Sequence, residues 1–430
     1  MMKLIAGSLT PLLLAVASMY NGADAFSSPA RNSASPTMLG SLQMHRSTSL
    51  MSKAAAITSD TNNQELSSNV AKLKRVLEQE YISFFNPMVD SWYAKDVTFN
   101  DPMTSLSGVE SYRNNVDMLA GRTLMGKVLF DGAGIQLHSV TGGGIKESSN
   151  GQIEIEDIIT RWTLKVTAKI LPWKPEAVFS GISVYKVQPG GEEGISIIGQ
   201  TDYWDSINIK PNTSSLSPKQ QYQKVPTSLA INDFLNQLKP DGFLAPAAAP
   251  ELPYLLLRRG DGYEIRKYPG FVGIETSYQR RDYGFGSLGA FAKGMNPLAP
   301  SLMKVWNDDN DAKDKIMTWP LEFALPGQGS DAPAPPALAV EKAGDGQWKS
   351  VSIASQSERV IAVRSFEDAA MGPVVRNCDR ELRELLKRDG LVPKEDSSDF
   401  VVFAQYDAVH SMGKRRSEVW IELKDGGHPF

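Results

Sequence analysis

The sequence is poor in the residues that build cross-links and metal centres. Cys378 is the single cysteine among 430 residues, which excludes an intramolecular disulfide framework and any site made of several thiolates. The four histidines, His45, His138, His410 and His428, are scattered along the chain. We therefore expect no metalloenzyme centre of the usual kind.

An excess of positive charge is also lacking. There are 45 Lys and Arg against 49 Asp and Glu, so the sequence does not indicate a nucleic-acid binder. After residue 25 no run is apolar and long enough to span a bilayer, and we expect a soluble or peripheral protein. The length predicts two or three domains.

The N-terminus has the composition of a targeting leader. An apolar run from Leu4 to Tyr20 precedes the small residues Ala23-Asp24-Ala25, which predicts a signal peptide over residues 1–25. Residues 26–60 are rich in Ser, contain no acidic residue before Asp60, and are expected to be a disordered, transit-like segment. The combination resembles the bipartite plastid leaders of algae such as diatoms, which implies the chloroplast stroma. The alternative is a secreted protein with a disordered tail.

Residues 65–211 have the pattern of an α+β domain. Apolar residues recur at helical spacing from Leu66 to Tyr81, and a second helix is expected from Gly108 to Leu119. The period then changes to two, which predicts long strands over 153–166, 177–187 and 195–209. Helices followed by a curved antiparallel meander predict a cone.

Four motifs in this domain resemble the NTF2-like fold, in particular a plant and algal family of unknown function. They are Val97–Pro102, Thr160–Leu164, Leu171–Pro175 and Asp202–Asp205. The resemblance implies a pocket inside the cone, which in some members holds a catalytic Asp/His pair. The candidates here are Asp101, His138, Asp157 and Asp202. Asp101 before Pro102 also fits a turn, and His138 fits a strand near the rim, so we assign no catalytic residue.

Residues 212–253 are expected to be a linker with one short helix, and residues 254–425 a second domain. A strand over 263–268, a helix over 284–293 and a strand over 315–320 are followed by a strand over 359–366 and a helix over 374–387. Pro320 lacks a backbone donor, so the strand before it should be an edge strand or stop at a bulge. The repeat predicts a duplicated antiparallel β-barrel flanked by two helices.

This second domain resembles the SOUL heme-binding family. The residues that carry the resemblance are Tyr263–Tyr268, Gly294–Asn296, Lys315–Pro320, Phe323–Pro326 and Arg415–Trp420. The resemblance implies non-covalent binding of heme or another tetrapyrrole in a shallow apolar groove, with cations for the propionates at its rim. Trp319 is bulkier than is usual at its position.

Carried onto this chain, the groove would be formed by one helix face and one loop. The helix face is Phe285, Leu288, Gly289, Ala292 and Lys293, and the loop holds His410, Ser411, Met412, Lys414 and Arg415. His410 is the histidine placed to ligate iron. The plain alternatives are that the helix residues are core, and that Arg415 and Arg416 form a solvated turn or pair with Glu418.

These patterns predict a plastid tetrapyrrole carrier that is not an enzyme, with the NTF2-like domain as an accessory module. Its partners would be the tetrapyrrole and plastid proteins, without nucleic acid, and it could be peripheral to a thylakoid or plastoglobule. One alternative is a scaffold or lipid-associated plastid protein that binds no heme. Another is an enzyme acting on a pigment or isoprenoid in the NTF2-like pocket.

Overall fold

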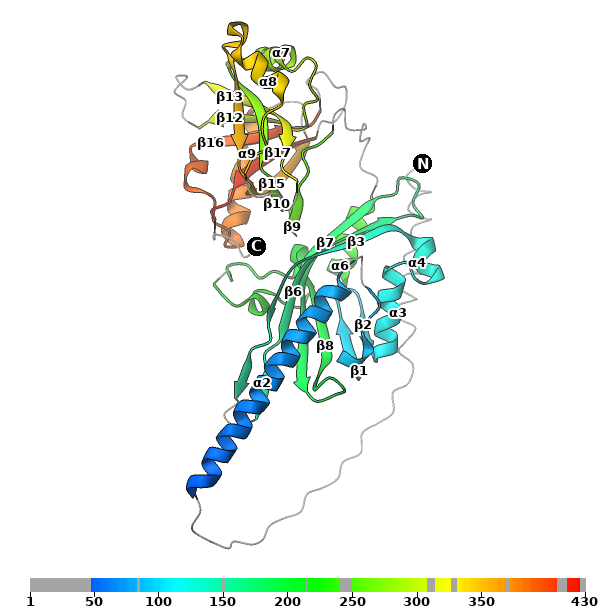
Figure 1. Cartoon of the computed structure of the whole chain (residues 1–430). Coiled ribbons are helices and arrows are strands. Elements are labelled where there is room, and N and C mark those ends of the chain that lie inside the picture. Colours follow the sequence, from blue (N-terminus) through cyan, green and yellow to red (C-terminus); the bar gives the residue numbers. More distant parts are fainter. Residues whose placement is uncertain are drawn as a thin grey trace.

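The chain forms two domains, each built around its own sheet (Figure 1). The computed structural model describes residues 48–82, 86–147, 152–213, 215–239, 250–307, 314–325, 331–367, 372–407 and 416–425. Within these residues no helix is both long and apolar enough to cross a membrane.

The N-terminal domain is an α+β cone, as predicted, but its first helix already begins at Thr48, inside the segment 26–60 that we expected to be disordered. Its six-stranded sheet has the order β2-β1-β8-β7-β6-β3, and the long helix α2 (Thr48–Glu80) crosses it (Figure 1). The strands are β1 (Tyr93–Asn100), β2 (Ser105–Ser107), β3 (Phe130–Gly142), β6 (Ile158–Ala168), β7 (Glu176–Pro189) and β8 (Ile195–Trp204). The further helices are α3 (Val109–Leu119), α4 (Leu124–Leu129), α5 (Asp205–Asn208) and α6 (Thr227–Gln237). Leu73 and Leu77 of α2 are fully buried against this sheet.

Two predicted strands of this domain were too long. The strand expected over 153–166 is interrupted at Glu156 and Asp157, and β5 (Ile153–Ile155) pairs instead with β4 (Ile145–Glu147) in a separate small sheet. The strand expected over 195–209 ends at Trp204, because Asn208 Oδ1 accepts a hydrogen bond from the Trp204 amide across the short helix α5. Both breaks are polar, but isoleucines flank the first, and Ile207 and Ile209 follow the second, so the expected strands ran past them.

The C-terminal domain is a curled nine-stranded sheet with the order β14-β11-β13-β12-β16-β17-β15-β10-β9. Its strands are β9 (Leu255–Arg259), β10 (Glu264–Tyr268), β11 (Phe271–Tyr278), β12 (Ser301–Trp306), β13 (Lys315–Phe323), β14 (Val351–Gln356), β15 (Arg359–Glu367), β16 (Phe400–Gln405) and β17 (Arg416–Glu422). Its helices are α7 (Arg281–Phe291), α8 (Ala337–Gly344) and α9 (Gly372–Arg388). The triplet β11-β13-β12 mirrors β15-β17-β16, and α7 and α9 follow the first strand of each triplet, which confirms the predicted duplication.

Strand β13 is central in its half of the sheet, so the prediction of an edge strand was wrong. It pairs with β11 on one side and β12 on the other. The alternative is confirmed in part: the register between β11 and β13 shifts between Val272 and Gly273, and Gly273 lies opposite Pro320, but β13 runs on to Phe323 and does not stop there. The missing N–H of Pro320 is accommodated where the ladder is already irregular.

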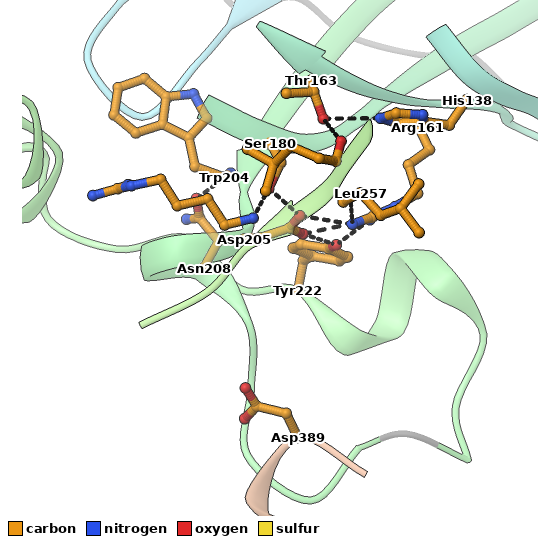
Figure 2. Close-up of polar contacts among 12 residues, drawn as sticks. His138, Arg161, Thr163, Ser180, Trp204, Asp205, Asn208, Tyr222, Leu257 and Asp389 are labelled. Atoms are coloured by element: carbon orange, nitrogen blue, oxygen red, sulfur yellow. Dashed lines mark hydrogen bonds and ion pairs between the residues drawn. The ribbon is translucent and has the colours of Figure 1, made fainter. Parts of the chain in front are cut away.

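A buried polar network joins the two domains. The Asp205 carboxylate accepts hydrogen bonds from Arg161 (Nη2, 2.7 Å), Ser180 (Oγ, 2.6 Å) and Tyr222, as Figure 2 shows. Strand β9 of the C-terminal domain lies across this network, where Arg161 Nη2 also donates to the Leu257 carbonyl (3.0 Å). The backbone of the second domain is therefore fixed by side chains of the first.

Candidate functional site

A cavity of about 530 Å³ opens in the C-terminal domain where the starts of α7 and α9 meet the strands β12, β13 and β16. Its described lining is Tyr278, Gln279, Arg281, Val305, Asn307, Lys315, Val375, Arg376, Val401 and Phe403. Such a volume is within the usual range for small-molecule sites.

The floor of the cavity is apolar. Val375, Val401 and Phe403 are buried members of the domain core, and Val305 is half-buried beside them. These side chains come from α9, β16 and β12 and present an aliphatic and aromatic surface to the opening. A ligand with an apolar face would displace water from this surface, which is favourable.

Three cations surround this floor. Arg281 is positioned by a hydrogen bond from its Nη1 to Gln405 Oε1 (3.2 Å). Lys315 and Arg376 are exposed, and neither forms a salt bridge within the described part of the chain. The three side chains offer charge-assisted hydrogen bonds to a ligand with carboxylate groups.

Tyr278 supplies a neutral hydroxyl at the same site. Burial raises the pKa of Tyr278 to about 12, although the nearby Arg281 guanidinium opposes the shift. The phenol therefore stays protonated near neutral pH and can donate a hydrogen bond, but it is a poor anionic ligand for iron. The arrangement as a whole suits a flat, amphipathic anion.

The residues predicted on the first helix divide between core and surface. Leu288 and Ala292 are buried in the domain core, whereas Gly289 and Lys293 are exposed. Phe285 is half-buried, with its ring centroid 5.8 Å from that of Trp319. The described lining of the large cavity includes none of these five residues and takes Arg281 from the same helix instead. Their role in binding stays a prediction.

The predicted loop residues His410, Ser411, Met412, Lys414 and Arg415 lie outside the described residues. The flanks of this loop are close together, because the Arg416 amide donates to Asp407 Oδ2 (2.6 Å). Gln405, the partner of Arg281, also donates through Nε2 to the Asp407 carbonyl (2.7 Å). Asp407, the last described residue before this loop, is therefore linked through Gln405 to Arg281 at the rim of the cavity.

The suggested pairing of Arg416 with Glu418 is wrong. Arg416 forms its ion pair with Glu251 and lies over the Tyr406 ring, 3.7 Å from the centroid. The Glu418 carboxylate is buried and accepts from Arg266 Nη1 (3.0 Å) and Tyr406 Oη (2.7 Å). Glu418 is thus a structural residue of the barrel.

Sequence reasoning missed the cations Arg281, Lys315 and Arg376. They lie at a helix start, a strand start and an exposed helix position, in three segments that no motif connects. Only the duplicated arrangement of α7 and α9 brings them together.

A neighbouring cavity of about 310 Å³ differs in kind, because charges of both signs line it and pair within it, as Lys394 does with Glu422 (2.7 Å).

The candidates in the N-terminal domain do not assemble into an Asp/His pair. Asp101 and Asp202 line one cavity inside the cone. His138 lies near the domain interface with Nε2 2.8 Å from Thr163 Oγ1, and burial together with Arg161 lowers the pKa of His138 to about 4 (Figure 2). Asp157 pairs with Lys219. In the part of the chain that the structure describes, no three His, Cys, Asp or Glu side chains converge as a metal site.

Comparison with known families agrees with this division into two domains. Residues 249–422 match the family described as SOUL heme-binding protein, and residues 71–195 match a family described as uncharacterized conserved protein (DUF2358). No curated protein sequence matches the chain.

Solved structures show only distant likeness. A hydrolase from Listeria innocua is 12% identical, with 41% of this chain and 94% of that chain covered and a TM-score of 0.28. Nuclear transport factor 2 from Cryptosporidium parvum is 13% identical, with 30% and 90% covered and a TM-score of 0.21. Such scores carry no functional argument, and the family matches are the informative result. The chain therefore carries a region similar to the uncharacterized family DUF2358, followed by a region similar to the SOUL heme-binding family.

Proposed function

We propose that the protein binds heme or another tetrapyrrole reversibly, in the cavity lined by the starts of α7 and α9, and acts as a carrier and not as an enzyme. The observation that carries the proposal is the combination of an apolar floor with the cations Arg281, Lys315 and Arg376 at its edge. The match to a heme-binding family supports the same ligand class.

The residues present fit such a ligand. Val305, Val401 and Phe403 would contact a porphyrin face, and the cations would bind its propionates, with Tyr278 as a neutral donor. When bound, heme would supply an iron centre, and the protein would control its access to water.

Axial ligation is a separate matter. His410 is the single histidine between residues 254 and 425. Cys378 is buried on α9, and burial raises the pKa of its thiol to about 11, which makes it a poor ligand. We propose His410 as the axial ligand, because Asp407, the last described residue before its loop, is linked through Gln405 to Arg281 at the cavity rim.

The test is titration of the full chain with hemin and with protoporphyrin IX, followed by absorbance and by quenching of tryptophan fluorescence. The double variant Lys315→Glu/Arg376→Glu should weaken both ligands about tenfold or more, since each lost charge-assisted hydrogen bond is worth roughly 1.5–3 kcal/mol. The matched control is Arg380→Glu/Lys387→Glu, which reverses two exposed charges on α9 away from the cavity.

Val305→Trp is a second variant that narrows the cavity without changing charge, and it should also weaken both ligands. His410→Ala should change the absorbance spectrum of bound hemin while leaving the affinity for protoporphyrin IX unchanged. Absence of saturable binding of either ligand, or equal binding by the rim variant and its control, would overturn the proposal.

We also propose that the protein functions in the plastid, on the basis of the composition of residues 1–60. A fluorescent protein fused behind these residues should accumulate in the plastid of an alga with complex plastids. Export from the cell would favour the secreted alternative and would leave the binding proposal intact.

A further inference from the structure

The N-terminal cone encloses a cavity of its own, of about 130 Å³, between the sheet and the helices α3 and α6. Most of its wall is aromatic or aliphatic. Besides two tyrosines, the aromatic part of the wall is Phe99, Phe130, Trp162, Phe179, Trp204 and Phe234. Phe179 lies tilted between Trp204 (ring centroids 4.5 Å apart) and Phe234 (6.0 Å apart).

One end of this cavity is polar and ordered by hydrogen bonds. Gln200 Nε2 donates to Asp202 Oδ1 (2.7 Å), and the Tyr112 hydroxyl donates to Gln200 Oε1. Ser183 Oγ accepts from Trp162 Nε1 (2.9 Å). The side-chain amide of Gln200 is therefore fixed in orientation, and it fixes one oxygen of Asp202.

Asp202 has hydrogen-bond partners but no cationic partner among the described residues. Its Oδ1 accepts from Gln200, and no salt bridge includes Asp202 within the described ranges. Burial raises the pKa of this carboxyl to about 7, although hydrogen bonds from Gln200 and Ser183 oppose the shift. Asp202 is half-buried at the cavity wall, so the protonated carboxyl can donate to a ligand in the cavity.

Asp101 provides the contrast. It lines the same cavity, but its Oδ1 accepts from the backbone amides of Met103 (2.7 Å) and Thr104 (2.5 Å). These bonds fix the turn between β1 and β2, so Asp101 has a structural task. Asp202 is half-buried, bonds to side chains and not to the backbone of a turn, and has no ion-pair partner among the described residues, which makes it the functional candidate.

We propose that this cavity is a second binding site, for a small neutral ring compound that carries one hydroxyl or carbonyl group. The ring would lie among Phe99, Trp162 and Phe179, and the polar group would meet Asp202. The volume is close to that of an engineered apolar cavity of about 150 Å³ that accepts benzene.

The charge of the lining selects against anions. The described residues that line the cone cavity include two carboxyls and neither Lys nor Arg, whereas the cavity of the C-terminal domain has three cations at its rim. A tetrapyrrole with propionates therefore suits only the second cavity. The two domains would bind different ligands.

The experiment uses four probes of similar size, p-cresol, toluene, benzoate and benzylamine, with binding to the full chain measured by saturation-transfer NMR and calorimetry. We expect p-cresol to bind at least tenfold more tightly than benzoate and several-fold more tightly than toluene. Asp202→Ala should abolish the preference for p-cresol over toluene while leaving toluene binding unchanged, which also reports that the cavity is intact.

The matched control is Asp131→Ala, an exposed carboxylate of the same domain that pairs with Lys174 at 3.7 Å. Val116→Trp, which fills the cavity, should remove binding of all four probes. Neither Asp202→Ala nor Val116→Trp should change hemin affinity, so this inference and the carrier function can fail separately. The inference is overturned if no probe binds, if benzoate or benzylamine binds most tightly, or if Asp202→Ala keeps the preference for p-cresol.

Discussion

The substitution Asp205→Ala tests whether the polar network between the domains holds them together. Asp205 has no exposed side-chain surface, and that of its partner Arg161 is 9% exposed. Burial by itself would raise the pKa of Asp205, but the charges of Arg161 and Arg258 and the hydrogen bonds from Ser180 and Tyr222 outweigh burial and lower it. The carboxylate is therefore ionised in the folded protein at neutral pH.

Removal of this carboxylate leaves guanidinium charge buried without its counter-ion. Breaking a buried pair in this way costs about 3–5 kcal/mol, whereas an exposed pair contributes about 0–1 kcal/mol. The matched control is Asp90→Ala, which removes an exposed carboxylate, paired with Arg113, from the same domain.

The assay is hydrogen exchange of the full chain, resolved for peptides that cover β6 and β9. In the Asp205→Ala protein the free energy of opening should fall by about 3–5 kcal/mol in both strands, because β9 is hydrogen-bonded to β6 side chains at Leu256 and Leu257. A loss below 1 kcal/mol, or a loss in β6 with β9 unchanged, would refute the reasoning.

Three further predictions concern stability. Burial raises the pKa of Glu80 to about 7, so between about pH 4.5 and 7 the folded protein holds a proton that the unfolded chain releases. The free energy of unfolding should therefore fall as pH rises through this range. In urea titrations at several pH values, the free energy of unfolding of Glu80→Gln should depend less steeply on pH than that of the unsubstituted chain. Asp205 acts in the opposite direction, because its lowered pKa adds stability that is lost as pH falls below about 4, and Asp205→Asn should remove that loss in the same titrations. Leu288→Ala should lower the free energy of unfolding by about 2–5 kcal/mol, because Leu288 is fully buried. Gly289→Ser, on the exposed side of α7, should lower it by less than about 1 kcal/mol. Equal effects would mean that a different face of this helix packs against the core.

Local pattern predicted much of the fold. The repeat of strand, helix and strand over 263–320 and 359–423 predicted the duplicated barrel, although the structure makes β11, and not the strand over 263–268, the counterpart of β15. The position of β13 was not predictable from its own residues, since Pro320 allowed both an edge and a bulge. The outcome depends on β11 and β12, which pair with β13 on its two sides, and no residue of β13 itself reveals these neighbours.

The candidate site was less predictable than the fold. Family resemblance pointed to one face of α7 and to one loop. The cavity described above takes Arg281 from α7 instead, while Leu288 packs into the core, so the binding roles of the predicted residues stay predictions. Arg376 and Lys315 carry no local signal, since an exposed cation on a helix or at a strand start is common. Asp202 was identified as a candidate, but its lack of a cation is visible only in three dimensions.

The position of Arg258 in β9 affects how this protein can be divided for experiments. Arg258 is 3% exposed. Tyr263 of its own domain and Asp205 and Tyr222 of the other domain raise the pKa of Arg258, so the guanidinium keeps its charge although it is buried. A C-terminal fragment that begins at residue 250 would bring this guanidinium to a bare surface and lose two of those three partners. A stable fragment would need either a substitution at Arg258 or the first domain added as a separate chain. Because the two domains are fused in the natural protein, each second domain always has one first domain beside it.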